Sequence, residues 1–542
     1  MILPLKNNLW RSICWLAALI LITPILVMLL ASLSSSSDLF SHLWQTVLPD
    51  YIANTLILGV LVVCLSLIFG TLSATFIVHT NVLGKKHLRW LLLLPLAMPA
   101  YLVAYLYTDI FDYAGPIQRA LREWFGWQSP SDYWFFDIRT LPGAAIVISL
   151  VLFPYVYMLA RTAFEHQDQN LLRAGRLLGL SAKQSFFKIA LPLARPAIAV
   201  SASLVLMETL ADFATVNYFA VNTLTTAIYD TWLGYGDLAA ANALASILML
   251  LILFVVVAEQ RARAGQNHQS NRPNQHIEVI KLSFVQQLSI SVFCWILVLS
   301  GFLIPFALLI LMAIENSNMS QLMDLLTPSV NSIEVSFYAA SIAVCLALLF
   351  GLYRRLSTDK WRMLPLNLAG FGYAVPGTVL AMVLLATFGP LDGFINEVAN
   401  YFELSSPGLV LSGTIFAVVF AFVVRFAAIA NGTISSGIEQ IPRSVDFAPA
   451  SLGVGLGKML RKVHIPILKP SIWVAWLLVF VESMKELPAV LLLRPFNFET
   501  LSIQIYQLIS DEMLEQGALG AILIVLLGLV PIIWLNRSKE LT

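Results

Sequence analysis

Four carboxylates, in two pairs with a spacing of four residues, stand inside long apolar stretches of the sequence. An ionisable group at the centre of a membrane-spanning helix costs at least about 2.5 kcal/mol on insertion scales, so such groups usually face a cavity or a partner. A spacing of four places both members of a pair on one helical face. Carboxylate oxygens are hard ligands that suit a hard, highly charged cation. The candidate pathway residues are Glu208, Asp212, Glu482 and Glu486.

Two plainer interpretations of these carboxylates stay open. Lys485 lies in the second stretch and would pair with Glu482 or Glu486 in a buried ion-pair cluster. Alternatively, all these side chains lie near an outer mouth, where water already reaches them. The seven histidines and four cysteines are scattered singly and make no metal-ligand spacing, so no fixed metal site is predicted.

The elements that carry the four carboxylates are predicted to be membrane-spanning helices. Of 542 residues, 59% are hydrophobic and 12% are charged, whereas a soluble domain has about 25% charged residues. This composition excludes a soluble enzyme and a nucleic-acid-binding protein, and the net charge of +1 offers nothing to a polyanion. Ten runs of at least 19 residues lack Asp, Glu, Lys and Arg, and about 20 apolar residues cross a bilayer. The runs are 12–37, 51–78, 90–108, 140–160, 238–258, 282–314, 335–353, 363–391, 404–424 and 516–536, and the interrupted stretches at about 194–216 and 470–493 make twelve.

The basic residues are distributed unevenly between the two sides of these helices. When alternate loops are assigned to opposite sides, one side receives 24 Lys and Arg residues and the other receives 4. Because loops rich in Lys and Arg stay in the cytoplasm, both termini are predicted to be cytoplasmic. The segment 109–139 is then the one long external loop, and it is rich in aromatic residues that suit the membrane interface.

An internal repeat relates the two halves of the chain at a shift of 274 residues. Residues 173–212 align with residues 447–486 without a gap, and Gly115-Pro116 obeys the same shift to Gly389-Pro390. Each half has six predicted helices, an even number, so the halves enter the membrane in the same direction, as parallel transporter repeats do. We therefore predict an all-α integral membrane protein with twelve transmembrane helices in two parallel six-helix repeats. The predicted parts are a first repeat at 1–258 (core about 51–258), a cytoplasmic linker at 259–281 and a second repeat at 282–542 (core about 331–536).

Transport is the natural use of such symmetry, although a duplication retained only for packing is the alternative. One cytoplasmic loop is kept in both repeats: a short helix ends near a glycine, an amphipathic stretch follows, and a proline opens the next membrane helix. Two equivalent exposed loops suggest two copies of one cytoplasmic partner. The residues that define these coupling loops are Ala174, Gly179, Ile189 and Pro192 in the first repeat, and Ala448, Gly453, Val463 and Pro466 in the second.

The two loops resemble the signature loop of permease subunits in type I ABC importers, whose spacing is E-A-A-x3-G-x9-I-x-L-P. In that family the loop forms a coupling helix that sits in a groove of the ATPase subunit. Both copies depart from the pattern, because Arg173 and Phe447 stand at the Glu position and Gly175 and Pro449 stand at the second Ala. The framework of Gly, Ile or Val, and Pro is retained.

The similarity extends to the fused permeases of bacterial ferric-iron importers, through residues 131–164, 207–232 and 481–508. The resemblance implies the type I ABC importer permease fold in a bacterial inner membrane, with two cytoplasmic ATPase subunits. It also implies ferric iron as substrate, delivered by a periplasmic binding protein that docks on the external segment 109–139. Thiamine, phosphonate and polyamine permeases share much of the pattern and stay open as alternatives. A proton-coupled carrier that uses the four carboxylates as a relay, and a membrane enzyme, are the rival classes.

ATP hydrolysis is not expected from this chain itself. The segment Gly453–Lys458 reads GVGLGK, which is followed by Met459 rather than Ser or Thr, and a phosphate-binding loop requires G-x4-G-K-[ST] after a strand. We therefore predict a transport subunit that is not an enzyme and binds no cofactor, with ATP and magnesium held by the partner subunits.

Overall fold

The computed structural model describes residues 8–34, 38–167, 169–263, 279–316, 319–442, 444–451 and 454–540. In this part of the chain the structure is almost wholly helical, and its single β-bridge joins Thr80 to Ile280. The predicted all-α class is confirmed.

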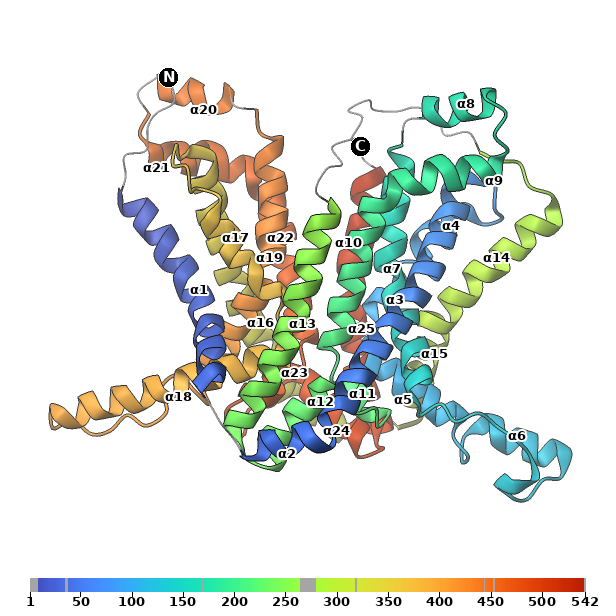
Figure 1. Cartoon of the computed structure of the whole chain (residues 1–542), viewed down its shortest axis with the longest axis horizontal. Coiled ribbons are helices and arrows are strands. Elements are labelled where there is room, and N and C mark those ends of the chain that lie inside the picture. Colours follow the sequence, from blue (N-terminus) through green and yellow to red (C-terminus); the bar gives the residue numbers. More distant parts are fainter. Residues whose placement is uncertain are drawn as a thin grey trace. The chain divides into compact units, whose positions relative to one another are not determined.

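The helices of the first repeat are drawn from blue to green in Figure 1. They are α1 (Asn8–Ser34), α2 (Asp38–Thr46), α3 (Leu48–His79), α4 (Lys85–Leu91), η1 (Leu94–Ala97), α5 (Ala100–Phe111), α6 (Pro116–Phe125), η2 (Pro130–Asp132), α7 (Leu141–Glu165), α8 (Gln169–Leu177), α9 (Ala182–Ser185), η3 (Phe186–Ala190), α10 (Leu191–Ala211), α11 (Ala214–Tyr218), α12 (Leu224–Tyr229), η4 (Asp230–Gly234) and α13 (Leu238–Arg263).

The helices of the second repeat follow from yellow-green to red. They are α14 (Phe284–Val298), η5 (Leu299–Leu303), α15 (Ile304–Asn316), α16 (Met319–Leu356), α17 (Leu364–Gly370), η6 (Phe371–Ala374), α18 (Gly377–Tyr401), α19 (Ile415–Gln440), α20 (Ser444–Ser451), α21 (Leu456–Met459), η7 (Leu460–His464), α22 (Ile465–Lys485), α23 (Pro488–Leu493), α24 (Leu501–Ser510) and α25 (Leu514–Glu540).

Eleven helices in the described residues are long and apolar enough to cross a membrane, and a bent pair raises the number to twelve. The predicted number of apolar spans is thereby confirmed, although the runs 363–391 and 404–424 each begin more than ten residues before the spanning helices α18 and α19. The bent pair is Lys85–Ala97 with Ala100–Phe125, which turns by 92° where the sequence predicts a straight span at 90–108. Met98 and Pro99 are extended at the turn, because a proline disfavours helical backbone at the residue before it.

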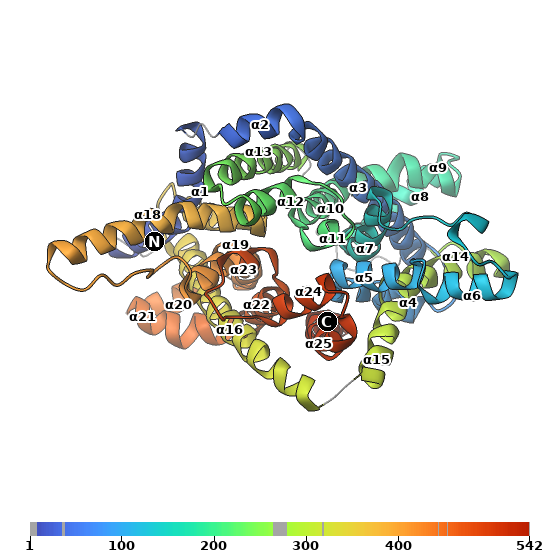
Figure 2. The same cartoon turned by 90° about the horizontal axis from the view of Figure 1, so that it is seen from below.

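The second repeat has the same break at Pro376, 277 positions after Pro99. There the chain continues as one helix, α18, which runs horizontally in Figures 1 and 2, whereas α22 of the same compact unit stands upright in Figure 1. The repeat therefore has a register of 277 in this region, not 274. The alignment of Gly115-Pro116 with Gly389-Pro390 is wrong as a structural equivalence: Gly115 precedes α6, while Gly389 and Pro390 lie inside α18.

The helices pack into two compact units. One unit contains Met1–His42, Ile228–Met249 and Met319–Tyr506, and its central helices α16, α19 and α22 pack against one another. In this unit α1 packs against α16, α17 and α18.

The other unit contains Leu43–Ala227, Leu250–Asn318 and Gln507–Thr542. Its central helices are α3, α7 and α10, the repeat equivalents of α16, α19 and α22. Here α14 packs on α3 and α4, and α15 packs on α25. Each compact unit therefore combines the core of one sequence repeat with outer helices of the other, so its boundaries differ from those of the repeats at 1–258 and 282–542.

Candidate functional site

The predicted pathway carboxylates lie where two long helices end. The stretch 194–216 is not one helix, because α10 ends at Ala211 and Asp212 is extended, with φ −70° and ψ 123°. The Asp212 carboxylate accepts hydrogen bonds from the backbone N–H of Thr215 at 2.8 Å and from the Thr215 hydroxyl at 2.7 Å. It thereby holds the first turn of α11, a use of Asp that is common at helix starts.

The second repeat places Glu486 in the same position, after the end of α22 at Lys485. Glu486 is buried, and its Oε1 accepts a hydrogen bond from the N–H of Ala489 at 3.1 Å in α23. Its Oε2 lies 3.4 Å from Nε of Arg425 in α19. Glu486 is therefore part of a buried ion pair, and its partner Arg425 comes from another helix; the predicted pairing of Lys485 with Glu482 or Glu486 stays a prediction.

Gly377, the first residue of α18, makes room for this ion pair. A Cβ atom at position 377 would collide with Oε1 of Glu486 and would lie 3.0 Å from Nη1 of Arg425. In the first repeat the corresponding residue, 277 positions earlier, is Ala100, and the shorter Asp212 needs less space. Sequence reasoning missed Arg425 and Gly377, because only packing brings α18, α19 and α22 together.

A repeated set of hydrogen bonds surrounds the two helix ends. The side chains of Thr225 and Ser502 donate to the backbone carbonyls of Asp212 and Glu486, both at 2.9 Å. In addition, Thr55 accepts from the N–H of Leu224, just as Ser332 accepts from the N–H of Leu501. Asp212 and Glu486 are thus parts of two equivalent brackets that hold broken helices in place.

Glu208 and Glu482 differ from this pair. Both lie in the last turn of a long helix, α10 or α22, and both are half-buried. The structure therefore separates the four carboxylates into two that cap short helices and two that remain within the long helices. Within the described residues no three His, Cys, Asp or Glu side chains are grouped to hold a metal ion.

The bracket of the second repeat gives a stability prediction. Glu486→Gln should lower the free energy of unfolding by about 3 kcal/mol, because Arg425 loses this counter-charge in a buried place. Asp212→Asn should cost about 1 kcal/mol, because an amide oxygen can still accept from Thr215. The measurement is the thermal unfolding midpoint of both purified variants in one detergent. Equal losses of stability in the two variants would contradict a larger contribution from the ion pair of Glu486.

The first coupling loop has the predicted form. Helix α8 ends at Leu177, and Gly179 has a φ of +85°, a conformation that glycine adopts without the strain of a side chain. Ala174 lies in α8, and its carbonyl accepts from the N–H of Leu178 at 3.0 Å. Pro192 is the second residue of α10, but η3 continues into α10 without a break, because Ala190 and Leu191 keep helical backbone, so this helix begins before the proline and the prediction that Pro192 opens it is wrong.

Packing explains the departure from the signature pattern at Gly175. This glycine is buried, and a Cβ on it would lie 2.5 Å from Cδ1 of Ile189, which belongs to η3. The short helix α8 therefore rests directly on Ile189. Beside this contact, Leu177 and Leu178 are 88% and 85% exposed, so the tip of the loop presents an apolar surface to solvent.

The second coupling loop is described in part. Ala448 lies in α20, Val463 lies half-buried in η7, and Pro466 is the second residue of α22, whereas Gly453 lies outside the described residues. Phe447, at the Glu position of the signature pattern, is 47% exposed. In the described residues, the coupling residues of each repeat thus lie between two long helices, α7 and α10 or α19 and α22, and at the start of the second of these.

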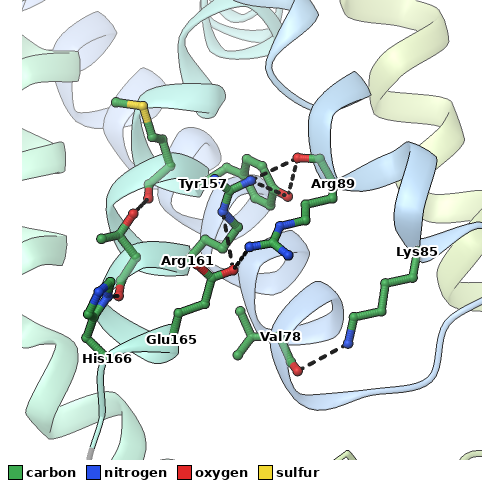
Figure 3. A network of polar contacts seen from close by, with 9 residues as sticks. Val78, Lys85, Arg89, Tyr157, Arg161, Glu165 and His166 are labelled. Carbon is green, nitrogen blue, oxygen red and sulfur yellow. Dashed lines mark hydrogen bonds and ion pairs between the residues drawn. The ribbon is translucent and has the colours of Figure 1, made fainter. Parts of the chain in front are cut away.

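A polar network fixes the helix that leads into the first coupling loop (Figure 3). Near the end of α7, Arg161 and the Tyr157 hydroxyl each donate to the backbone carbonyl of Arg89 in α4 at 2.9 Å. Glu165 accepts from Arg89 at 2.8 Å and lies 3.7 Å from Nε of Arg161. Because Arg161 is buried, these contacts hold α7 and α4 together at the start of the loop.

The aromatic segment 109–139 folds into an ordered lobe. Phe125, Trp127 and Tyr133 stack in sequence with ring centroids 4.7 Å apart. Two backbone N–H donors, of Gln128 and Ser129, hold the pKa of the Asp132 carboxyl below its usual value.

This lobe contains a cavity of about 540 Å³. Aromatic rings and a few charged groups form its wall, and the tip residues Trp124 and Trp134 are 88% and 86% exposed. The lining residues are Thr108, Phe111, Asp112, Tyr113, Gln118, Pro130, Tyr133, Trp134, Phe135, Phe136, Asp137, Ile138 and Arg139. Exposed aromatic side chains beside a cavity are typical of a protein-binding surface.

Comparison with known proteins agrees with this arrangement of two loops in two repeats. Residues 66–264 and residues 343–538 each match the family described as binding-protein-dependent transport system inner membrane component. The chain belongs to this family. The two matches cover both coupling loops, so each repeat is one copy of the family's permease unit.

Named relatives of this permease come from several bacteria. An Fe(3+)-transport system permease protein, FbpB 2 of Haemophilus influenzae, is 26% identical over 506 residues, which cover 91% of each chain. The ferric transport system permease protein FbpB of Actinobacillus pleuropneumoniae is 26% identical over 522 residues, 90% of this chain and 70% of the relative. The molybdenum transport system permease protein ModB of Escherichia coli K12 is 31% identical over 230 residues, 41% of this chain and 95% of the relative.

Proposed function

We propose that this chain forms the membrane pathway of an ATP-driven importer of ferric iron. The observation that carries the proposal is the extent of the matches. The two relatives named for ferric transport align with about nine tenths of the chain, through both repeats, whereas the molybdenum relative aligns with 41% of it. A relative named for 2-aminoethylphosphonate transport aligns with 39%.

The partners follow from the family and from the two exposed loops. Family membership means that the chain works in a binding-protein-dependent system, and the coupling loops at 173–192 and 447–466 are the proposed docking sites for two copies of a cytoplasmic ATPase. ATP and magnesium belong to those subunits in this proposal. The uneven distribution of basic residues supports an inner-membrane orientation with both termini in the cytoplasm.

The aromatic lobe at 109–139 is the proposed docking surface for the periplasmic binding protein. Its exposed tryptophans and its cavity suit a protein partner. The loop between α18 and α19 of the second repeat, residues 402–414, is of similar length but has one aromatic residue, against five in residues 126–140. One wing of the permease would then carry most of the specific contact with the binding protein.

Among the four carboxylates, Glu208 and Glu482 are the proposed pathway residues. They lie within the long helices and keep partial access to solvent. Asp212 and Glu486 support the pathway by holding the helix ends. A hard trivalent cation is attracted by carboxylates, and weak contacts let it leave again.

Uptake in intact cells tests the substrate. Cells that lack the operon, and the same cells complemented with it, should be compared for uptake of radioactive ferric iron, molybdate, 2-aminoethylphosphonate and thiamine. We expect deletion to abolish iron uptake and complementation to restore it. If deletion abolished uptake of one of the other three compounds and left iron uptake intact, that compound would be the substrate and the family would be unchanged. Uptake driven by a pH gradient without ATP would support a proton-coupled carrier.

A further inference from the structure

The second coupling loop is tied to the core of its compact unit by a buried cluster of charged and polar groups. Asp446 lies in the first turn of α20, and its carboxylate accepts from Nε of Arg355 at 2.9 and 3.1 Å. Nε2 of His464 lies 2.7 Å from the same carboxylate, and His464 has no exposed surface. Arg355 comes from the last turn of α16, and His464 directly precedes α22.

Arg355 also binds the end of α19. Its Nη1 donates to the carbonyl of Ile438 at 2.6 Å and to that of Ile441 at 3.0 Å, while Nη2 donates to the carbonyl of Pro442 at 3.1 Å. Carbonyl groups at the end of a helix have no partner within the helix and attract cations. One guanidinium therefore joins α16, the end of α19 and the coupling helix α20, and Asp446 extends this cluster to α22.

The first coupling loop is attached differently. The positions that correspond to Asp446 and His464 are Leu172 and Ala190, which cannot form such a cluster. In the described part of this loop, the Gln167 amide donates a neutral bond to the carbonyl of Ala190 at 2.7 Å, and Gly175 contacts Ile189. The two loops therefore share a backbone framework, but Asp446 and His464 have no counterpart in the first repeat.

The position of the carboxylate is informative. Asp446 stands one residue before Phe447, which replaces the Glu of the signature pattern. Its carboxylate binds this chain's own α16 and His464, in a place where the Asp446 side chain is 16% exposed and that of Arg355 is 10% exposed. Charge-assisted hydrogen bonds to a bidentate guanidinium are strong and directional, so α20 can hardly tilt without moving the three core helices.

We propose that Arg355, Asp446 and His464 form a clamp that transmits movement of the second coupling helix to α16, α19 and α22. This inference rests on the proposed function, because it concerns how an ATPase docked on the loop drives the pathway. The clamp residues are positioning residues: they touch neither substrate nor nucleotide. In this proposal the second coupling loop moves together with the core helices of its compact unit.

The test uses the complete complex of permease, ATPase and binding protein in proteoliposomes. Arg355→Gln and Asp446→Asn should leave assembly and ATP hydrolysis within about twofold of the parent, while transport per ATP hydrolysed falls about tenfold. His464→Gln, whose amide can still donate to Asp446, should retain more transport per ATP than His464→Leu.

Arg354→Gln is the matched control. Arg354 is adjacent to Arg355 and pairs with Glu439 at 2.7 Å, but the Glu439 side chain is 67% exposed, and such surface pairs contribute little. The control should couple hydrolysis to transport as the parent does. Because Asp446→Asn conserves volume, it keeps the test available if Arg355→Gln gives little folded complex.

The possible failures are distinguishable. A normal ratio of transport to hydrolysis in both clamp variants would overturn the clamp and leave the importer intact. A parallel fall of both activities with the amount of folded complex would also overturn it, since that is a structural effect. If the parental complex itself showed no ATP-driven transport, the proposed function would fail first.

Discussion

Replacement of both Glu208 and Glu482 by Gln is expected to abolish iron uptake without loss of folded protein. Each residue lies in the last turn of a long helix and is half-buried. The repeat makes the two positions equivalent, so each half of the permease should contribute one carboxylate to the pathway. In the double variant, neither position offers a negative charge to a trivalent cation.

The single variants should lose activity in a graded manner. A unit charge 4 Å from another contributes about 4 kcal/mol per unit of cation charge at an effective dielectric constant of 20, and solvent screening at half-buried positions reduces this strongly. We therefore expect about 1.4 kcal/mol for each single variant, which corresponds to a tenfold lower rate of uptake. The measurement is initial ATP-driven uptake of radioactive iron into proteoliposomes.

Glu439→Gln is the control for these substitutions. Glu439 is exposed at the end of α19 and pairs with Arg354, so it is a glutamate outside α10 and α22. Its substitution should leave uptake unchanged. Uptake by the double variant near the parental rate would remove the two carboxylates from the pathway, and a lowered unfolding midpoint in the double variant would assign them a structural role like that of Glu486.

The sequence predicts the spanning helices well, because about 20 consecutive apolar residues have few other uses in a protein. Local signals are also reliable where one residue type dictates backbone geometry. Gly179, for example, takes a positive φ after α8, as the sequence predicts for a glycine near the end of a short helix. These features need no knowledge of distant contacts.

Two helix breaks escaped the prediction although the sequence contains their signals. Pro99 stands inside the apolar run 90–108 and marks the bend before α5. Pro488 stands two residues after Glu486 and marks the start of α23. A continuous apolar run hides such breaks, because hydropathy measures the preference for lipid and not the direction of the chain.

The exchange of outer helices between the repeats has no local signal. Helix α1 packs with the second repeat's core, while α14 and α15 pack in the unit of the first. All these helices present apolar surfaces, so pattern alone cannot choose among partners. The same holds for Arg425, whose role depends on the approach of Glu486 from another helix.

Substitution of Leu177 and Leu178 together by Asp is expected to abolish binding of the ATPase to the permease. These residues end α8 beside Gly179 and are 88% and 85% exposed. Full burial of a leucine side chain contributes about 1.5–3 kcal/mol, and a charge introduced into an apolar groove adds a desolvation cost. The combined effect should weaken binding at least about a hundredfold, as expected for residues at the centre of an interface. Co-purification of the ATPase with tagged permease measures it.

The matched control places the same substitutions at another pair of exposed leucines. Leu404 and Leu409 are 65% and 66% exposed and lie in the loop between α18 and α19, on the side of the membrane opposite the coupling loops in the proposed orientation. Leu404→Asp with Leu409→Asp should leave the ATPase bound. Phe447→Asp in the second loop should weaken binding less, because that side chain is 47% exposed. If the ATPase co-purified with the Leu177 and Leu178 double variant in the parental amount, the loop at 173–192 would not be its docking site, and the apolar tip of α8 would need another partner.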